Sequence, residues 1–390
     1  MPTIVTNFCS VPPANRLAQD VSLDWLAAAH ARAEATQSRL NQTPIDEAAF
    51  RHELRRRLER FGCGSHQISW REVDLDDCSH QRFSEMDLYC LDQCPSGATT
   101  RARTEFFDKA ARRAITRLYA DIERAPSDLI HVTCTGYVSP SAGQQLAERK
   151  GWGDTTRVTH AYHMGCYAAF PALRIAAGLL RDSTETAEHD RRTDIVHTEI
   201  CSLHFHPLLH SPEQLVVQSL FADGFIRYSV VDEAHTRQHA PGFLLLGSHE
   251  QIIPNSSDAM TWLASDHGMH MTLARDVPDR LMQALPEFVR HLVARAGVPE
   301  SDLHTATYAI HPGGPKILDC ALQALLLDES QISASRRLLR ARGNMSSATL
   351  PHVWMDLLLS SATPHDSLIV SLAFGPGLTL CGTVMRKVES

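Results

Sequence analysis

The chain has 390 residues, 43% of them hydrophobic and 21% charged, as expected for an ordinary globular protein with a large buried core. The net charge of −8, from 37 Lys and Arg against 45 Asp and Glu, argues against a broad nucleic-acid-binding surface. No apolar run reaches the roughly 18 residues that a membrane span needs, and the first residues do not resemble a signal peptide. Ten cysteines in such a chain predict reduced thiols and a cytoplasmic location.

In the first half, helical spacing of apolar residues alternates with short β-branched runs. Residues 1–60 predict helical and irregular structure, including an amphipathic helix over 45–61 that is rich in arginine. The later elements that we expect are helices over 104–122, 141–150, 167–180 and 212–221, and strands over 128–135, 194–202 and 225–231.

The second half repeats this alternation and ends in a β-hairpin around a Gly-Pro-Gly turn. The expected elements are helices over 279–296, 315–327 and 349–360, a strand over 303–310, a loop over 342–347, and the hairpin strands 367–373 and 378–388. Alternating strands and helices predict an α/β fold with a buried sheet. Because no stretch has the composition of a linker, we expect two closely packed halves, 1–235 and 236–390.

Cys166 follows Gly165 and precedes the expected helix over 167–180. The N-terminus of a helix carries partial positive charge, which stabilises a thiolate and lowers the pKa of the thiol. Cys166 is therefore a candidate nucleophile, although by itself it also fits a buried structural thiol.

Two more candidate site residues lie in the second half of the sequence. His311 ends the expected strand over 303–310 and is followed by Pro-Gly-Gly, which would present its imidazole to a pocket. Asn344 lies in a loop after Gly343, where a helix-capping or turn role would be ordinary. Together a thiol, an imidazole and an amide supply a nucleophile, a base and two N–H donors for an oxyanion.

A metal site is the weaker interpretation of the cysteines. Cys78, Cys90 and Cys94 lie near His80, but the spacing contains no CxxC pair. We therefore expect no metal.

These residues lie in segments that resemble the active-site segments of type III polyketide synthases, the chalcone synthase family. The segments are HMGCYAAFPALRIA (163–176), YAIHPGGPKILD (308–319), RGNMSSATLPHVW (342–354), AFGPGLTL (373–380), QSLFADG (218–224) and VTCTGYVSP (132–140). They follow the order of the family from about residue 45 to 388. The resemblance implies a thiolase fold, with two similar βαβαβαββ-like halves packed as five layers (αβαβα), in a homodimer.

For the site, the resemblance implies that Cys166 carries the acyl chain as a thiolate paired with His311. It further implies that His311 and Asn344 hold the enolate formed from malonyl-CoA, and that Phe221 separates the CoA tunnel from the cavity. The implied cavity residues are Cys134, Glu199, Cys201, His204, Ser346 and Pro376. Cys134, Glu199 and Ser346 would form the polar set for ring closure, and Cys134 stands where plant members have Thr.

CoA thioesters are the implied substrates, with no other cofactor. For their phosphates the arginine-rich helix suggests Arg55, Arg56 and Arg57, because guanidinium groups bind phosphate bidentately. Lys316, Gly313 and Gly314 lie where the pantetheine arm would run. The expected partners are an acyl-CoA starter, malonyl-CoA and a second copy of the chain, with an acyl carrier protein or fatty-acid synthase as a further acyl donor.

The segment from 197 to 230 resembles bacterial alkylresorcinol and alkylpyrone synthases. This predicts a long-chain fatty acyl starter and an alkylresorcinol or alkylpyrone product. Three other enzymatic interpretations stay open: a synthase with an aromatic, short-chain or malonyl starter, a ketosynthase III-like enzyme that condenses once, and a cysteine hydrolase. A non-catalytic acyl-binding protein is the last alternative.

Overall fold

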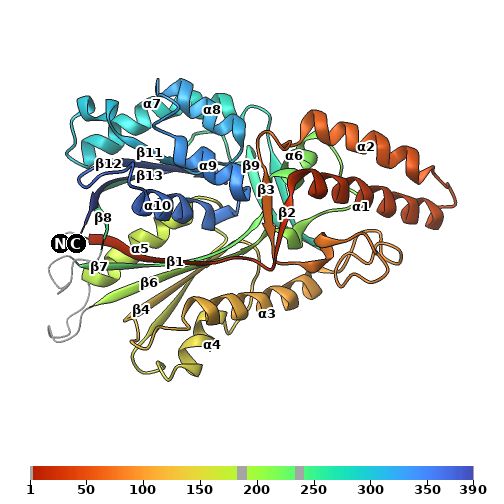
Figure 1. The fold of residues 1–390 in the computed structure, drawn as a ribbon, viewed down its shortest axis with the longest axis horizontal. Helices are drawn as coiled ribbons and strands as arrows, with labels where there is room; N and C mark the ends of the chain where they lie inside the picture. Colours follow the sequence, from red (N-terminus) through yellow and green to blue (C-terminus); the bar gives the residue numbers. More distant parts are fainter. Residues whose placement is uncertain (1–2, 182–190, 233–240, 390) are drawn as a thin grey trace.

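The structure is a computed structural model, and it describes residues 3–181, 191–232 and 241–389 (Figure 1). The strands are β1 (Thr3–Val11), β2 (Asn15–Ala18), β3 (Trp70–Val73), β4 (Asp128–Thr133), β5 (Arg157–Tyr162), β6 (Arg192–Ile200), β7 (Asp223–Asp232), β8 (Gly242–Ile252), β9 (Met260–Ser265), β10 (Gly268–Leu273), β11 (Thr307–Ile310), β12 (Leu368–Gly375) and β13 (Thr379–Val388). The helices are α1 (Gln19–Leu40), α2 (Glu47–Phe61), α3 (Thr100–Leu118), α4 (Ala142–Arg149), α5 (Ala169–Arg181), α6 (Pro212–Leu220), α7 (Val277–Arg295), α8 (Pro315–Ala324), α9 (Ser333–Arg342) and α10 (Thr349–Leu359).

Nine of the described strands form one mixed sheet in the order β11-β12-β13-β8-β1-β7-β6-β4-β5. The strands of the first half (β1, β7, β6, β4 and β5) join those of the second half where Thr3–Thr6 of β1 pairs with Gly242–Leu245 of β8. Parallel pairs connect β5, β4 and β6, while β6, β7, β1, β8 and β13 pair antiparallel. The strands β4, β6, β7 and β12 are buried along almost their whole length, whereas β5 and the end of β8 are partly exposed.

Helices cover both faces of each half of the sheet, which gives five layers (Figure 1). The helices α3 and α4 pack on the outer face of the first half, and α7 and α8 pack on the outer face of the second half. Between the two halves lie α5 and α10. Alternating residues of β4 show this division, because Leu129 joins the outer cluster and Ile130 joins the central one. The layers thus follow the predicted order αβαβα.

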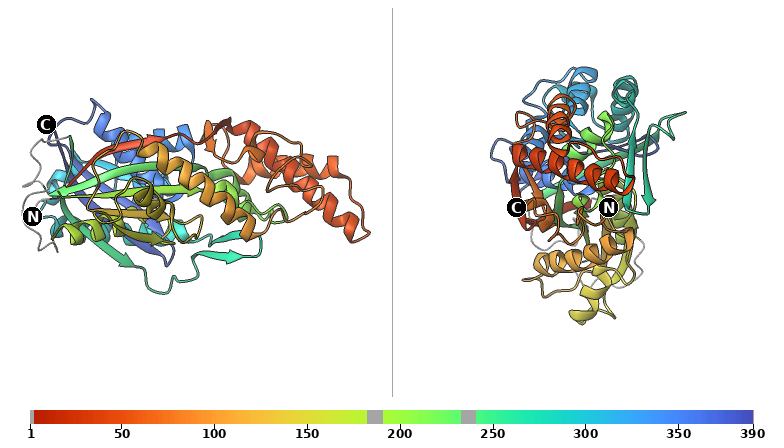
Figure 2. Two further views of the ribbon diagram at one scale, coloured as in Figure 1. Left: turned by 90° about the horizontal axis from the view of Figure 1, so that it is seen from below. Right: turned by 90° about the vertical axis from the view of Figure 1, so that its right-hand side faces the viewer.

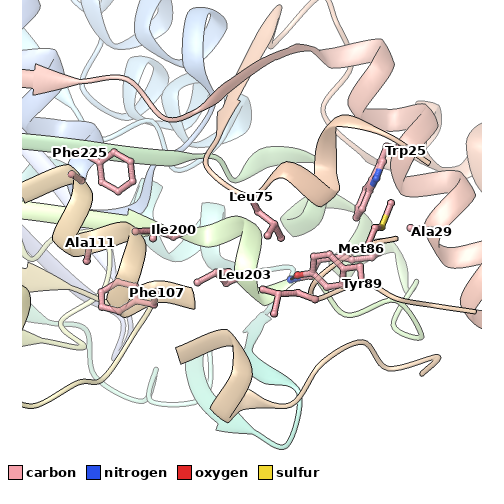
Figure 3. Packing of buried hydrophobic residues seen from close by; sticks show 14 of the residues in the cluster. Trp25, Ala29, Leu75, Met86, Tyr89, Phe107, Ala111, Ile200, Leu203 and Phe225 are labelled. Atoms are coloured by element: carbon pink, nitrogen blue, oxygen red, sulfur yellow. Dashed lines mark hydrogen bonds between the residues drawn. The ribbon is translucent and has the colours of Figure 1, made fainter. Parts of the chain in front are cut away.

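The helices α1 and α2 extend beyond one end of the sheet, and the β9–β10 hairpin lies along the outside of the molecule (Figure 2). Trp25 and Ala29 connect α1 to the body through a cluster of buried residues that includes Tyr89, Leu203 and Phe107 (Figure 3). Trp25 also packs edge-on against Tyr89, with the ring centroids 5.8 Å apart. The core of this end is therefore continuous with the outer cluster of the first half.

Most of the predicted elements are confirmed to within a few residues, including the helices that follow Cys166, His311 and Asn344. The prediction for residues 1–60 was wrong in one respect, because β1 and β2 lie there. Thr3, Ile4, Val5 and Thr6 of β1 are all buried, so β1 lacks the alternation of a half-exposed strand. The prediction also missed β3, β5, β8, β9, β10 and α9. The predicted boundary between 235 and 236 lies outside the described residues.

Candidate active site

A cavity lies between the ends of the central strands, the helices α1 and α6, and the β9–β10 hairpin. Its lining is mostly apolar and comes from segments that are far apart in the sequence. Seven of the residues singled out from the sequence line it: Cys134, Cys166, Cys201, His204, Phe221, Ser346 and Pro376.

Cys166 sits on a sharp turn between β5 and α5. His163 and Gly165 both have positive φ, of 63° and 80°, and α5 begins three residues after Cys166. A Cβ atom at Gly165 would lie 2.5 Å from Cδ of Pro376, and one at Gly375 would overlap the ring of Tyr167. Only glycine fits at either position, so the loop after β12 packs directly against the turn that carries Cys166.

The Cys166 sulfur lies among side chains from both halves of the chain. Its thiol points to the hydroxyl of Ser346, with 4.0 Å between Sγ and Oγ. Burial raises the pKa of Cys166 to about 12, against contacts with Ser346 and Asn344 that lower it. Burial therefore outweighs the hydrogen bonds, and the thiol form is favoured.

Asn344 lies in the loop after α9 and is held by its neighbours on both sides. Its Oδ1 accepts from the backbone N–H of Ser346 at 2.9 Å and from the Thr349 hydroxyl at 3.2 Å. With the amide oxygen occupied, the NH₂ group is left to donate towards Cys166. The backbone of Asn344 bonds to Leu220 and Ala222, on either side of Phe221. The structure thus brings Asn344, Phe221 and Cys166 together.

His311 directly follows β11, and its N–H donates to the carbonyl of Leu372 at 2.7 Å. Because β11 and β12 run parallel, His311 lies at the end of the sheet where β12 leads to Gly375 and Pro376. Both ring nitrogens are buried and have no partner among the described residues. Burial lowers the pKa of His311 to about 3, so the neutral imidazole is favoured. Its ion pair with Cys166 stays a prediction.

Glu199 does not line the cavity but lies buried behind Cys134. Its carboxylate accepts from the backbone N–H of Cys134 at 3.0 Å, from the Thr135 hydroxyl at 2.9 Å and from the Ser347 hydroxyl. Burial raises the pKa of this carboxyl group despite these bonds. The Cys134 thiol in turn accepts from the Gly165 N–H at 3.1 Å. Glu199 therefore supports the strand end next to the Cys166 turn.

His204 holds the β9–β10 hairpin against the cavity. Its Nε2 donates to the carbonyl of Thr135 and its Nδ1 accepts from the N–H of Met269, both at 3.0 Å. Burial lowers the pKa of His204 to about 3, which agrees with a neutral ring. The sequence analysis did not predict the β9–β10 hairpin. It therefore missed the hairpin residues that line the cavity wall (Met260, Trp262, Met269 and Met271).

The residues suggested for CoA lie outside the cavity lining. Arg55 pairs with Asp20, Asp24 and Glu59, and Arg56 pairs with Glu53. Arg57 donates to the carbonyl of His210 at 2.6 Å. Lys316 is exposed in the first turn of α8, just after Gly313 and Gly314. A Cβ atom at Gly314 would contact Leu220, the neighbour of Phe221.

Over residues 3–181, 191–232 and 241–389, no three His, Cys, Asp or Glu side chains form a group that could hold a metal ion. Cys90 and Cys94 instead point to the carbonyls of Ser84 and Gly97. All ten cysteines lie in the described residues and are free thiols, as predicted. No described helix is long and apolar enough to cross a membrane.

Comparison with protein families gives two matches that together span most of the chain. The N-terminal domain of chalcone and stilbene synthases matches residues 37–231, and their C-terminal domain matches residues 245–389. Type III polyketide synthase C of Arabidopsis thaliana is 28% identical over 264 residues, which are 67% of each chain. Probable polyketide synthase 1 of Dictyostelium discoideum is 30% identical over 71% of this chain, a match to only 9% of that protein.

Two solved structures share the fold over almost the whole length. One is the C-terminal type III polyketide synthase domain of Steely1 from Dictyostelium, with a TM-score of 0.80, 24% identity and 100% coverage of both chains. The other is PKS-I of the brown alga Ectocarpus siliculosus, with a TM-score of 0.82, 18% identity and coverage of 99% and 98%. These likenesses confirm the predicted thiolase-like α/β fold.

The protonation of Cys166 gives a pH-dependent prediction. With its pKa raised to about 12, Cys166 is a thiol at pH 7. Below this pKa, the thiolate fraction rises about tenfold for each unit by which the pH increases. We expect alkylation of Cys166 by iodoacetamide to be slow at pH 7. The rate constant of alkylation should then rise about tenfold with each pH unit towards pH 10. Mass spectrometry of the Cys166 peptide measures it, with the half-buried Cys9 as internal reference. A rate that is already high and flat between pH 6 and 8 would instead reveal a standing thiolate–imidazolium pair.

Proposed function

Because the chain belongs to the chalcone and stilbene synthase family, and is thus a type III polyketide synthase and an acyltransferase, we propose a starter and a product for it. The starter is a long-chain fatty acyl-CoA, which is extended with malonyl-CoA on Cys166 and closed to an alkylresorcinol or alkylpyrone. One observation carries this proposal: the cavity that contains Cys166 continues between α1 and α6 along apolar side chains such as Trp25, Leu26 and Val217. Each buried methylene contributes about 0.8 kcal/mol, so an apolar arm favours a long chain.

The first step loads the starter onto Cys166. The Cys166 sulfur attacks the thioester carbonyl of the starter while its proton passes to His311, whose buried ring nitrogens have no other partner in the part of the chain that the structure describes. The bond from the carbonyl carbon to the CoA sulfur breaks, and CoA leaves with the proton that His311 carries. The thiolate–imidazolium pair thus forms during the reaction, which agrees with burial favouring the neutral forms in the empty site.

The second step forms the carbon–carbon bond. Malonyl-CoA loses CO₂, and the electron pair of the broken bond becomes an enolate whose oxygen accepts from His311 and Asn344. The enolate carbon attacks the acyl group on Cys166, and the Cys166 thiolate leaves. The Asn344 amide can donate here because its oxygen is occupied by Ser346 and Thr349. The chain, now two carbons longer, returns to Cys166 for the next cycle.

Phe221 is the proposed gate between CoA and the cavity. It caps α6, lines the cavity and bridges to Asn344, so it lies beside the reacting atoms. We place the pantetheine arm along Gly313 and Gly314 with Lys316 near its phosphate, because Gly314 adjoins Leu220. Arg57 is a further phosphate ligand in this proposal, while Arg55 and Arg56 would first have to leave their carboxylate partners.

For ring closure we propose the set of Cys134, Glu199 and Ser346. Cys134 and Ser346 line the cavity on two sides of Cys166, and Glu199 touches the backbone of Cys134. Glu199 would act through Cys134 and Thr135, since it has no surface in the cavity.

A homodimer is also part of the proposal. Among the described residues β5 is an edge strand of the sheet, and the exposed Tyr137 lies beside it, stacked edge-on against Tyr162. An uncovered edge strand is a surface along which a second copy can pair. We expect sedimentation at micromolar concentration to give the mass of two chains, and a stable, fully active monomer would contradict this.

The free thiols favour a reducing compartment such as the cytoplasm.

The proposed function is tested with malonyl-CoA and a panel of aromatic, short-chain and long-chain acyl-CoA starters, with products identified by mass spectrometry. We expect multiply extended, cyclised products, formed fastest from long-chain starters. Cys166→Ala should give neither acyl-enzyme nor product, while Cys320→Ala, outside the cavity lining, should keep activity.

A single condensation on an acyl carrier protein would indicate a ketosynthase III-like enzyme. Peptide hydrolysis without any decarboxylation would indicate a cysteine hydrolase, and a preference for aromatic or short starters would overturn the proposed starter.

The proposed roles of His311 and Asn344 concern decarboxylation. Removing one oxyanion donor typically costs about 10² to 10³ in rate. We therefore expect His311→Ala and Asn344→Ala to slow release of CO₂ from malonyl-CoA by about that factor. Asn344→Asp, which keeps the shape but loses the donor, should behave like the alanine variant. Normal CO₂ release in either alanine variant would remove that residue from the enolate site.

A further inference from the structure

Residues 218–223, here called the Phe221 segment, run from the last turn of α6 into β7 and bond to the backbone of Asn344. The N–H of Asn344 donates to the carbonyl of Leu220 at 3.0 Å. The N–H of Ala222 donates to the carbonyl of Asn344 at 2.8 Å. These two bonds make the position of Asn344 depend on the position of the Phe221 segment.

The short strand β3 holds the Phe221 segment at two points. A terminal nitrogen of Arg71 donates to the carbonyls of Gln218 and Phe221 at 2.7 and 3.1 Å, at the negative end of α6. Three residues later, the N–H of Asp74 donates to the carboxylate of Asp223 at 2.6 Å. One strand therefore fixes the segment both before and after Ala222.

Asp223 also connects the Phe221 segment to the cavity wall. Its Oδ1 accepts from the N–H of Ser202 at 2.8 Å, and its Oδ2 accepts from the Ser202 hydroxyl at 2.6 Å. Ser202 lies in the short 3₁₀ helix Cys201–His204 after β6 and lines the cavity. The Asp223 carboxylate thus joins β3, the Phe221 segment and the wall at one point.

Only a carboxylate serves all these donors. The N–H of Ser202 points to Oδ1 and the N–H of Asp74 points to Oδ2, so an amide of the same shape would turn its NH₂ group towards one of them. Asp223 is 0% exposed, and burial raises its pKa to about 7 despite these bonds. The charge is disfavoured in this place, so the benefit of Asp223 lies in the contacts that it makes.

Resting on the role proposed above for Asn344, we infer that Asp223 and Arg71 are positioning residues for the decarboxylation of malonyl-CoA. They fix the Phe221 segment, and this segment fixes the backbone of Asn344, whose amide holds the enolate. Asp223 does not line the cavity, so it acts through its hydrogen bonds and not by contact with substrate.

Cys166 depends on a different support. Its turn is set by the contact between Gly165 and Pro376, which involves neither Asp223 nor Arg71. Transfer of the starter to Cys166 should therefore not require Asp223, whereas decarboxylation should. The two half-reactions thus separate this role from a general loss of stability.

The experiment compares the two half-reactions in the full chain with Asp223→Asn. We expect release of CO₂ from malonyl-CoA to slow by about 10- to 100-fold, because a small displacement of a catalytic group already has such an effect. The rate of acylation of Cys166 by an acyl-CoA starter, followed by mass spectrometry of the intact protein, should stay as in the wild type. Normal CO₂ release, or an equal slowing of both half-reactions, would overturn the inference.

Two further variants calibrate this result. Asp194→Asn changes another fully buried aspartate, which accepts from the Ser229 hydroxyl at 2.7 Å at the far end of the same two strands, β6 and β7. It should leave both half-reactions unchanged. Ser202→Ala removes the hydroxyl but keeps both backbone bonds to Asp223, so CO₂ release should slow less than in Asp223→Asn. A larger effect of either variant than of Asp223→Asn would contradict the inference.

Arg71→Lys tests the second contact of β3, and it decides the question if circular dichroism shows that Asp223→Asn does not fold. Lysine keeps the charge but is shorter and lacks the guanidinium fork that reaches the carbonyls of Gln218 and Phe221. We expect the same separation, with slower CO₂ release and normal acylation of Cys166. Unchanged CO₂ release in this variant would remove Arg71 from the role and, without a folded Asp223→Asn, overturn the inference.

Hydrogen exchange separates this inference from the proposed function, because it needs no turnover. In Asp223→Asn, peptides that cover 220–224 and 343–346 should exchange about tenfold faster, while helix α7 should be unchanged. If they do so but the wild-type chain releases no CO₂ from malonyl-CoA, the positioning contact stands and the proposed function fails. If the wild-type chain makes polyketides but the variant changes neither exchange nor CO₂ release, the inference fails alone.

Discussion

The turn that carries Cys166 and the loop that follows β12 touch without room for a single methyl group between them. Gly165 lies against Pro376, and Gly375 lies against Tyr167. This contact fixes the first half of the chain against the second at the point where the thiol meets Asn344 and Ser346. A side chain at either glycine would separate the Cys166 thiol from Asn344 and Ser346, so the geometry of the whole site depends on close packing here.

Burial is the second consequence of this packing. Cys166 and His311 are both removed from water, which raises the pKa of the thiol and lowers that of the imidazole. Both groups are therefore held in their neutral forms until a substrate changes their surroundings. Asn344 differs from them because an amide does not titrate, and its orientation is set by bonds to Ser346 and Thr349.

Around this fixed centre the cavity wall comes from elements that carry no chemistry of their own. His204 and Trp262 hold the β9–β10 hairpin to the strand end at Cys134 and Thr135. The α1 helix supplies Trp25 and Ser22 to the far wall. The turn that carries Cys166 and the wall of the cavity can thus vary separately.

The sequence alone determined the alternation of helices and strands, because their local periodicity is strong. It singled out Cys166, His311 and Asn344 only through their combination and the resemblance of their segments to a known family, since each residue by itself fits an ordinary structural role. It did not determine β1, whose buried Thr3–Thr6 stretch joins the two halves of the sheet, since a strand covered on both faces has no alternation. Only the tertiary structure decided that Glu199 stands behind the cavity and that Arg55 is paired with carboxylates. It alone showed that Arg71 donates to the carbonyls of Gln218 and Phe221 at the end of α6. These outcomes depend on which distant side chains meet, and local spacing carries no information on such contacts.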